Sequence, residues 1–486
     1  MSQIKKLFKQ TFIYGLATVL PRMLSFLLLP LYTGVLETAG YGEISIIFSW
    51  FAIFNVLLAY GMETAFFRFY NKAEDRKKVV TTSLISIGAT TLIFVIIALI
   101  FKDVIAHLTN IEVKYIHYAI YILALDALVI VPFAWLRANE QPMRYAVIKI
   151  LNVSVNFGLN IFFLILLPKM VAENSNTLFS GLYKPNFELS YIFISNLIAS
   201  AITLLLMLKL YLRQPYVFDK HLWVKMMKYG LPVLVAGIAF TINEVFDKIL
   251  LSYLLPEAIA ESEIGKYSAC YKLAMFMTLF ATAFRIGIEP FFFSHSSSQN
   301  PQKAYAQITN YFVILGSIIL LGIVVFADLL KVLFVRDSSY WEAMSVVPLI
   351  VLAAFCLGIY HNLSVWYKVT DRTKFGAYIS IAGAILTIII NFAFIPSFGY
   401  KASAVATLVA YATMMVLSYY YGKKYYPVPY NLRKIIFYLG VSILFSILSF
   451  YVFDRNLVIG ILFLSIFLGI VYKLENDSLK QIFLKK

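Results

Sequence analysis

Long apolar runs alternate with short polar segments along the whole chain. A transmembrane helix needs roughly 20 consecutive and mostly apolar residues. The pattern therefore predicts an all-α polytopic membrane protein with about fourteen spans, whose connections are too short to fold as a soluble domain. The predicted spans are 11–35, 43–67, 79–101, 115–136, 146–167, 188–211, 229–254, 265–293, 306–327, 343–367, 375–395, 402–421, 433–453 and 457–473.

Composition supports the same class. Apolar residues make up 61% of the 486 positions and charged residues only 14%. Soluble proteins are typically about half apolar and about a quarter charged. The net charge of +16 arises from Lys and Arg in loops beside apolar runs. We interpret these cations as topology signals and contacts for anionic lipids, and we expect no nucleic-acid partner.

The Lys and Arg residues also predict the orientation of the spans. If the N-terminus and every second loop are cytoplasmic, 28 of the 41 Lys and Arg residues lie on that side, 9 lie on the other side and 4 lie within spans. Cytoplasmic loops of membrane proteins carry such an excess of positive charge. The sequence therefore predicts an even number of spans in the cell (inner) membrane, with both termini cytoplasmic.

A weak internal repeat relates spans 1–6 to spans 7–12. Tyr14-Gly15 opens span 1 and Tyr229-Gly230 opens span 7; Gly40-Tyr41-Gly42 follows span 1 and Gly265-Lys266-Tyr267 follows span 7. Six helices separate the matching motifs, so the two halves share one orientation, as in the parallel repeats of some transporters. The predicted organisation is an N-terminal six-helix lobe at 1–213, a second six-helix lobe at 214–424, and two additional helices with a cytoplasmic tail at 425–486.

Ionisable residues at membrane depth are costly and are therefore candidates for function. Arg22 follows Pro21 midway along span 1, and no acidic residue lies within four positions of it. An arginine at this depth must face protein, water or an anionic ligand, and its guanidinium fork suits phosphate. The candidate substrate-binding residues are Arg22, Asp126, Lys272 and Arg285.

Two pairs of charged residues have a simpler interpretation. Glu244 and Lys248 are four positions apart on span 7, and Arg285 and Glu289 have the same spacing on span 8. Such pairs can neutralise each other on one helix face. We leave open whether these charges only pair or also act in transport.

Polar residues in spans 11 and 12 have two interpretations as well. Thr387, Asn391, Ser403 and Thr407 can pack and hydrogen-bond neighbouring helices. If they lie opposite the acids of span 7, they would instead supply oxygen ligands for a small cation. The candidate ion-coupling residues are Glu244, Asp247, Thr387, Asn391 and Thr407.

The sequence contains few signals of catalysis. The five histidines are scattered without metal-ligand spacing, and no Walker motif or nucleophile elbow occurs. Cys270 and Cys356 lie in apolar segments and are interpreted as small core residues. We therefore expect no enzyme, no catalytic residue, no metal and no cofactor.

Several segments resemble the O-antigen and other polysaccharide flippases of the Wzx type, in the multidrug/oligosaccharidyl-lipid/polysaccharide exporter superfamily. The residues that carry the resemblance are Phe12-Ile13-Tyr14-Gly15, Leu29-Pro30-Leu31-Tyr32-Thr33, Gly40-Tyr41-Gly42, Asn391 to Gly399 and Ala402 to Thr407. The likeness covers essentially the whole chain, although its motifs are diffuse. The polar segment after span 5 is longer than the one after span 11, which departs from strict symmetry of the lobes.

The resemblance implies a transporter that flips a polyprenyl-pyrophosphate-linked oligosaccharide from the inner to the outer leaflet during cell-surface polysaccharide (lipopolysaccharide) synthesis. It implies alternating access between two lobes, and Arg22 and Arg285 are the positions that match basic residues of a central cavity. It also implies a cation site on spans 7, 11 and 12, where Asp247, Asn391 and Thr407 lie, and it leaves coupling to Na⁺ or H⁺ open. The expected partners are the lipid-linked substrate, membrane lipids and polysaccharide-assembly proteins.

Three alternatives stay open at this point. A cation-coupled multidrug antiporter would have the same fold, but its substrate would favour an acidic cavity, whereas Arg22, Lys272 and Arg285 favour an anion. A membrane-embedded glycan polymerase or transferase would be expected to carry a larger loop with clustered catalytic groups. A pure scaffold would give no reason for buried charge.

Overall fold

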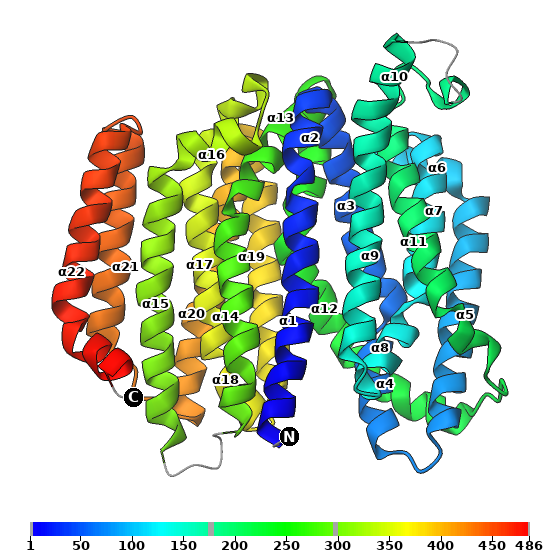
Figure 1. Cartoon of the computed structure of the whole chain (residues 1–486), viewed down its shortest axis with the longest axis horizontal. Coiled ribbons are helices and arrows are strands. Elements are labelled where there is room, and N and C mark those ends of the chain that lie inside the picture. Colours follow the sequence, from blue (N-terminus) through cyan, green and yellow to red (C-terminus); the bar gives the residue numbers. More distant parts are fainter. Residues whose placement is uncertain (1–2, 174–178, 295–299, 485–486) are drawn as a thin grey trace. The chain divides into compact units, whose positions relative to one another are not determined.

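The computed structural model describes residues 3–173, 179–294 and 300–484, and every regular element within them is helical (Figure 1). The chain divides into two compact units, residues 1–265 and 266–486. The predicted all-α polytopic fold is therefore confirmed.

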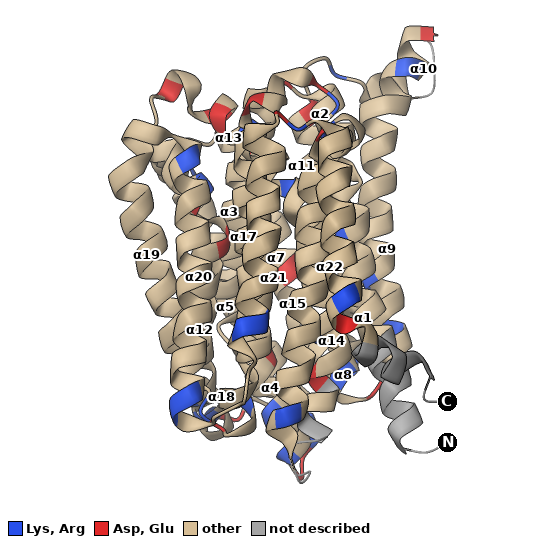
Figure 2. Cartoon of the chain, turned by 90° about the vertical axis from the view of Figure 1, so that its left-hand side faces the viewer, with Lys and Arg blue, Asp and Glu red and all other residues tan. Residues whose placement is uncertain are grey.

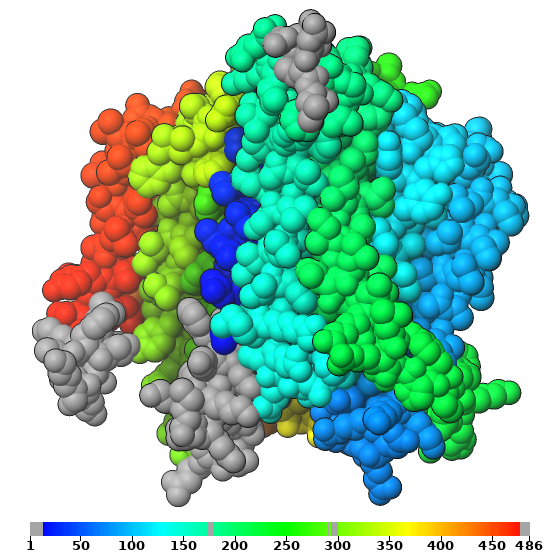
Figure 3. Space-filling view, turned by 45° about the vertical axis from the view of Figure 1, so that its right-hand side comes forward, coloured from blue at the N-terminus to red at the C-terminus, as the bar shows by residue number. Residues whose placement is uncertain are grey.

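In the first unit, α9 packs against both α1 and α11, and α3 packs against both α7 and α12. Figure 3 shows α1, in blue, running alongside the cyan-green surface of α9. The elements of this unit are α1 (Gln3–Phe26), α2 (Leu28–Val35), α3 (Thr38–Ala59), α4 (Met62–Lys72), α5 (Arg76–Ile100), α6 (Lys102–Thr109), α7 (Val113–Leu128), α8 (Ile130–Ala138), α9 (Pro142–Ile161), the π-helical turn η1 (Phe162–Leu166), α10 (Leu167–Glu173), η2 (Ser180–Leu182), α11 (Glu188–Leu212), α12 (Lys220–Leu254) and the first part of α13 (Glu257–Tyr271).

In the second unit, α20 packs against α17 and α19, and α15 packs against α17, α21 and α22. The remaining elements are η3 (Lys272–Ala274), α14 (Met275–Ser294), α15 (Pro301–Val325), α16 (Ala327–Phe334), η4 (Ser338–Val346), α17 (Val347–Leu363), α18 (Val365–Val369), α19 (Lys374–Phe398), α20 (Tyr400–Tyr425), α21 (Leu432–Ile447), the π-helical turn η5 (Leu448–Val452) and α22 (Leu457–Leu484).

The last two helices are joined by a buried carboxylate. Glu475 on α22 accepts hydrogen bonds from Lys434 Nζ and from the Tyr438 hydroxyl on α21, each at 2.7 Å. The Glu475 side chain is 4% exposed, so this ion pair lies largely out of water. Breaking such a buried pair leaves an uncompensated charge, so the contact favours a fixed position of α22 on α21.

Thirteen segments of the described chain are long and apolar enough to cross a membrane. The remaining predicted span corresponds to α12, which has 35 residues but carries Glu244, Asp247 and Lys248 in its second half. In Figure 2, Lys, Arg, Asp and Glu gather toward the two ends of the helices, with only a few between them. This distribution fits helices surrounded by lipid, because charges at membrane depth are costly.

The predicted lobe boundary differs from the division found by packing. A boundary after residue 213 assigns α12 to the second lobe, whereas the first compact unit extends to Gly265 and includes α12. The reason is that α12 packs along α3 and α4. The symmetry of two six-helix lobes stays a prediction.

A glycine joins α3 to α4 within one span. Tyr60 and Gly61 both have left-handed backbone conformations, with φ of 31° and 72°. A Cβ on Gly61 would lie 2.2 Å from the carbonyl oxygen of Gly230 on α12. Only glycine fulfils both conditions, since it tolerates positive φ and lets two backbones approach closely.

Two glycines of the sequence repeat meet where α3 crosses α13. A Cβ on Gly42 would lie 1.8 Å from the Glu261 carbonyl oxygen, and a Cβ on Gly265 would lie 1.8 Å from the Thr38 carbonyl oxygen. The Thr38 and Ser262 hydroxyls are hydrogen-bonded at 2.7 Å beside them. Small residues permit such close approach of membrane helices, so we name this contact the glycine crossing.

Candidate functional site

A polar cavity of about 480 Å³ lies within the first unit, among α3, α4, α7, α8, α9, α11 and α12. Membrane-spanning helices seldom place several polar groups around one cavity unless these groups bind a ligand or water. The polar lining residues are Asn55, Glu63, Thr64, Asp126, Lys149, Asn152 and Thr203.

Asp126 is the predicted site residue that lies in this cavity. It occupies the last turn of α7, where the span breaks into α7 and α8. The Ser200 hydroxyl on α11 donates a hydrogen bond of 2.7 Å to Asp126 Oδ1. This bond fixes one carboxylate oxygen of a residue that lines the cavity.

Lys149 is a cavity residue that the sequence analysis missed. Its ammonium lies 4.2 Å from the centre of the Phe133 ring, within the range of a cation–π contact. Asp126 and Glu63 lie within electrostatic range of it. The charge pattern along the sequence groups Lys149 with the loop cations, because it lies close to the end of its span. Only the packing of α8 against α9 shows that it faces a cavity.

The remaining polar groups of the cavity are partly tied to the protein. Asn152 Nδ2 donates to the Thr203 hydroxyl at 2.9 Å. Glu63 accepts from Arg137 at 2.6 Å, and both side chains of this pair are close to half exposed. The cavity therefore combines a cation and carboxylates with amide and hydroxyl groups, which can donate and accept hydrogen bonds.

Arg22 lies outside the lining of this cavity. It is exposed on α1, one position after Pro21, and α1 packs against α9. The polar cavity is therefore built without Arg22, and the anion-binding role of Arg22 stays a prediction.

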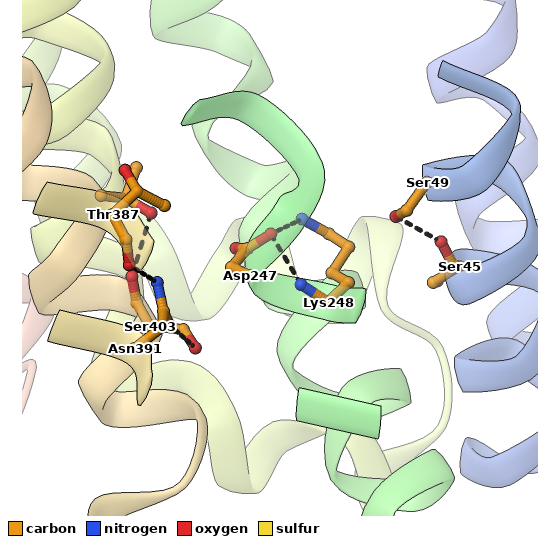
Figure 4. A network of polar contacts seen from close by, with 8 residues as sticks. Ser45, Ser49, Asp247, Lys248, Thr387, Asn391 and Ser403 are labelled. Carbon is orange, nitrogen blue, oxygen red and sulfur yellow. Dashed lines mark hydrogen bonds and ion pairs between the residues drawn. The ribbon is translucent and has the colours of Figure 1, made fainter. Parts of the chain in front are cut away.

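The charged cluster of α12 is arranged around Asp247. Asp247 is buried, and its Oδ1 accepts from the backbone N–H of Lys248 at 2.8 Å and from Lys248 Nζ at 3.1 Å (Figure 4). Glu244 is exposed on the same helix. The ion pair of Lys248 is thus formed with the adjacent Asp247, whereas the sequence spacing favoured Glu244.

In the second unit, the predicted polar residues of spans 11 and 12 lie together and are buried. Ser403 on α20 donates to Asn391 Oδ1 on α19 at 2.7 Å (Figure 4). Asn391 donates to the Thr387 carbonyl at 2.7 Å, and Thr407 donates to the Ser403 carbonyl at 3.0 Å. The bond between Ser403 and Asn391 connects α20 to α19, whereas the other two bonds lie within one helix each.

The two other predicted basic residues also lie in the second unit. Lys272 begins η3, the short 3₁₀ turn between α13 and α14. Arg285 lies half-buried on α14, within electrostatic range of His361 on α17. Glu289 accepts from Lys368 at 2.7 Å, so its ion pair runs to α18.

Some of the predicted residues are thus brought together and others are not. Thr387, Asn391 and Thr407 form one cluster, and Glu244 and Asp247 share one helix. A cation site would require both groups, which belong to different units. That site, like the substrate role of Arg285 and Lys272, stays a prediction. The described residues contain no group of three or more His, Cys, Asp and Glu that could hold a metal.

Comparisons with known proteins identify the relatives of the chain. The model of the polysaccharide biosynthesis protein family matches residues 7–294, and the MatE model matches residues 232–393. No curated protein sequence matches the chain.

Solved structures share the fold at low sequence identity. The lipid II flippase MurJ in an inward closed conformation has 16% identity and a TM-score of 0.71, covering 95% of this chain and 99% of MurJ. An inward-facing multidrug resistance MATE transporter of the MOP superfamily has 15% identity and a TM-score of 0.64, covering 83% and 94%. A MOP superfamily transporter from Pyrococcus furiosus, titled for the reverse polarity of its binding pocket, has 14% identity and a TM-score of 0.58, covering 87% and 94%.

Proposed function

The chain belongs to the polysaccharide biosynthesis protein family, and we propose that it flips a polyprenyl-pyrophosphate-linked oligosaccharide from the inner to the outer leaflet. Its fold is shared with flippases and transporters of the MOP superfamily. Flipping makes and breaks no covalent bond, so the proposed protein is a transporter and not an enzyme.

The observation that carries the proposal is the position of Lys149 in the polar cavity. The Lys149 ammonium contacts the face of the Phe133 ring. Among the described residues, no acidic side chain forms an ion pair with Lys149. A lysine ammonium has three donors and binds phosphate as a point charge. In the water-poor interior between helices, the diphosphate of the substrate would form charge-assisted hydrogen bonds with Lys149.

The other polar groups of the cavity suit a sugar. Asn55, Asn152 and Thr64 provide amide and hydroxyl groups, and Asp126 provides a carboxylate oxygen. Sugar hydroxyls both donate and accept hydrogen bonds, so they match such a mixed lining. The saccharide would occupy the cavity while the polyprenyl chain stays in the bilayer.

The predicted orientation adds a direction to this transport. If the chain lies in the inner membrane with both termini in the cytoplasm, the connections from α4 to α5 and from α8 to α9 are cytoplasmic. The helices α4 and α8 and the first part of α9 then lie at the cytoplasmic ends of their spans. The polar cavity then lies in the cytoplasmic half of the bilayer, where lipid-linked oligosaccharides enter. Alternating access would carry the head group outward.

We also propose a cation-coupling role for the α12 acids and the α19–α20 cluster. In the first unit, the carboxylates of Asp247 and Glu244 would bind Na⁺ or H⁺, and in the second unit Thr387, Asn391 and Thr407 offer oxygen atoms of the kind that a small cation binds. Because Lys248 occupies one oxygen of Asp247, a cation would have to displace this contact. Polysaccharide-assembly proteins and membrane lipids are the proposed partners beyond the substrate.

A second candidate function is a cation-coupled multidrug antiporter. The match of the MatE model to residues 232–393 and the two carboxylates in the cavity favour it. Its substrate would be a cation, and it would bind Asp126 instead of Lys149. Replacing Lys149 would then increase transport of cationic dyes.

The experiment uses purified protein in liposomes with a fluorescent polyprenyl-pyrophosphate oligosaccharide, with and without a Na⁺ or H⁺ gradient. Lys149→Gln is compared with Lys114→Gln, because Lys114 pairs with Glu112 near the start of α7 and lies outside the cavity. A hydrogen bond to a charged group contributes roughly 1.5–3 kcal/mol. We therefore expect Lys149→Gln to slow flipping about tenfold or more at low substrate concentration.

Three outcomes decide between the readings. Slow flipping by Lys149→Gln with unchanged flipping by Lys114→Gln supports the proposed site. Equal rates for both variants overturn the role of Lys149. Protein-dependent transport of cationic dyes, with no movement of the oligosaccharide, overturns the flippase in favour of the antiporter.

A further inference from the structure

A second cavity, of about 240 Å³, opens at one end of the first unit, between α8, α9 and α11. Three basic side chains line it, Arg144 from α9, Lys209 from the last turn of α11, and Arg213 just after α11. Its lining contains no acidic residue. We name this group the basic pocket.

The general excess of positive charge in cytoplasmic loops does not account for the basic pocket. That excess places cations in a loop but does not direct them toward one cavity. Arg144 and Arg213 lie far apart in the sequence, Arg144 near the start of α9 and Arg213 just after the end of α11. All three side chains are exposed, and none forms an ion pair with an acidic residue in the described part of the chain. Three like charges held close together repel one another, so the arrangement favours an anion between them.

Fixed contacts hold the walls of the pocket in place. The Tyr211 hydroxyl on α11 donates to the Leu128 carbonyl at the end of α7 at 2.5 Å. The Tyr216 hydroxyl donates to the Tyr211 carbonyl at 2.8 Å. These two bonds hold the end of α11 and the connection after it against the break between α7 and α8. The backbone that carries Lys209 and Arg213 is therefore fixed in place.

The pocket also has an apolar side. Its apolar lining residues are Trp135, Leu136, Met207 and Leu210, and Gln214 adds an amide to the polar part. Leu212 next to it is 76% exposed. An indole ring beside cations at the end of a membrane helix is typical of the interface between lipid tails and head groups. A ligand of this pocket can therefore place an anion on the cations and a hydrocarbon chain along the helices.

We propose that the basic pocket binds the phosphate head group of an anionic membrane phospholipid. Arginine forks bind phosphate oxygens in pairs, and basic pockets between transmembrane helices at the cytoplasmic side bind anionic head groups. The site is separate from the polar cavity, since the two share no lining residue. The bound lipid would hold α8, α9 and α11 together, which are three of the helices that form the polar cavity.

The test measures lipid binding to the full chain in a neutral detergent by native mass spectrometry. The triple variant Arg144→Gln/Lys209→Gln/Arg213→Gln is titrated with phosphatidylglycerol and cardiolipin. The matched control is Lys72→Gln/Lys77→Gln/Lys78→Gln, which removes the same charge from the end of α4 and the first turn of α5. Each basic residue near an anionic surface contributes roughly 1 kcal/mol, so the triple variant should bind at least tenfold more weakly. The control should retain affinity within about twofold, because its cations do not line the pocket.

Competition by soluble and lipid-linked phosphates identifies the source of the anion. Displacement of the phospholipid by polyprenyl phosphate at lower concentration would assign the pocket to the substrate and overturn the assignment to a membrane lipid. Equal displacement by inorganic phosphate alone would show a site for a free anion and overturn it as well. Equal loss of binding in both triple variants would show that binding depends only on the total charge of the protein. It would refute the assignment of the lipid site to the basic pocket.

A second variant protects the test against misfolding. Arg213→Lys keeps the charge but loses the guanidinium fork, and Arg213→Gln loses both. We expect binding to weaken in the order wild type, Arg213→Lys, Arg213→Gln, with unchanged elution in size-exclusion chromatography. Equal affinity of all three proteins would overturn a direct contact between Arg213 and the phosphate.

Discussion

The glycine crossing of α3 and α13 allows one substitution to be worked out in detail. In Gly42→Ala, the added Cβ would lie 1.8 Å from the Glu261 carbonyl oxygen, whereas contacts under 3.0 Å force a displacement. The atom that must move belongs to the backbone, so the two helices have to separate by about 1.2 Å, the difference between these distances. Overpacking of this kind costs about 1–3 kcal/mol.

The displacement would also stretch the hydrogen bond between Thr38 and Ser262, now 2.7 Å long. Loss of one such bond costs about 0.5–1.5 kcal/mol. We therefore expect Gly42→Ala to lower the free energy of unfolding by about 2–4 kcal/mol. The measurement is chemical unfolding of the purified protein in detergent, followed by circular dichroism.

Gly88 provides the matched control, since it lies on α5 of the same unit and a Cβ there would meet no atom within 4 Å. Gly88→Ala should stabilise the protein by up to about 1 kcal/mol, because alanine favours a helix over glycine. A cysteine pair at positions 38 and 262 reports the crossing directly, and Gly42→Ala should reduce its disulfide formation. If Gly42→Ala is as stable as Gly88→Ala and crosslinks equally well, the reasoning on close backbone contact is wrong.

Two further predictions concern carboxylates. The Ser339 hydroxyl and backbone N–H bind Asp337 and hold its pKa below the usual value, so this group stabilises the folded state above about pH 4 and loses that effect as the pH falls further. Thermal unfolding of Asp337→Asn should therefore differ from wild type at pH 6, and the difference should shrink steadily as the pH is lowered below about 4. Glu475→Gln removes the charge that pairs with Lys434 across α21 and α22, so trypsin should cleave α22 several-fold faster than in the control Glu257→Gln, which changes an exposed acidic residue. Equal cleavage of the two variants would contradict a role of the ion pair in holding α22.

The fold was predictable because the membrane imposes strong rules on the sequence. Apolar runs of about 20 residues have few alternatives to transmembrane helices. Of the predicted spans, α12 alone is not apolar enough to count as a membrane-crossing helix by its composition in the described chain. Glu244, Asp247 and Lys248 are the reason. Breaks within spans were not predictable from apolar runs, because the left-handed turn at Gly61 depends on the contact with Gly230.

The candidate site was only partly predictable, for a different reason. Asp126 was found because it lies in the middle of an apolar run, where a carboxylate is costly. Lys149 lies near the end of its run, where a lysine can reach water, so its position alone gave no signal. The partners of Lys248 and Glu289 depended on rotamers and neighbouring helices, which the four-residue spacing does not specify.

The charge of α12 has a consequence for how the chain enters the membrane. A charged residue near the centre of an inserting helix costs about 2.5–3.5 kcal/mol at the translocon, and α12 carries Glu244, Asp247 and Lys248 within five positions. Such a helix leaves the translocon slowly when it is alone. It packs along α3 and α4, which are synthesised well before it. We expect α12 to insert only after these helices are available as partners, so that the first unit is completed late in biogenesis, when the ribosome has already passed residue 254.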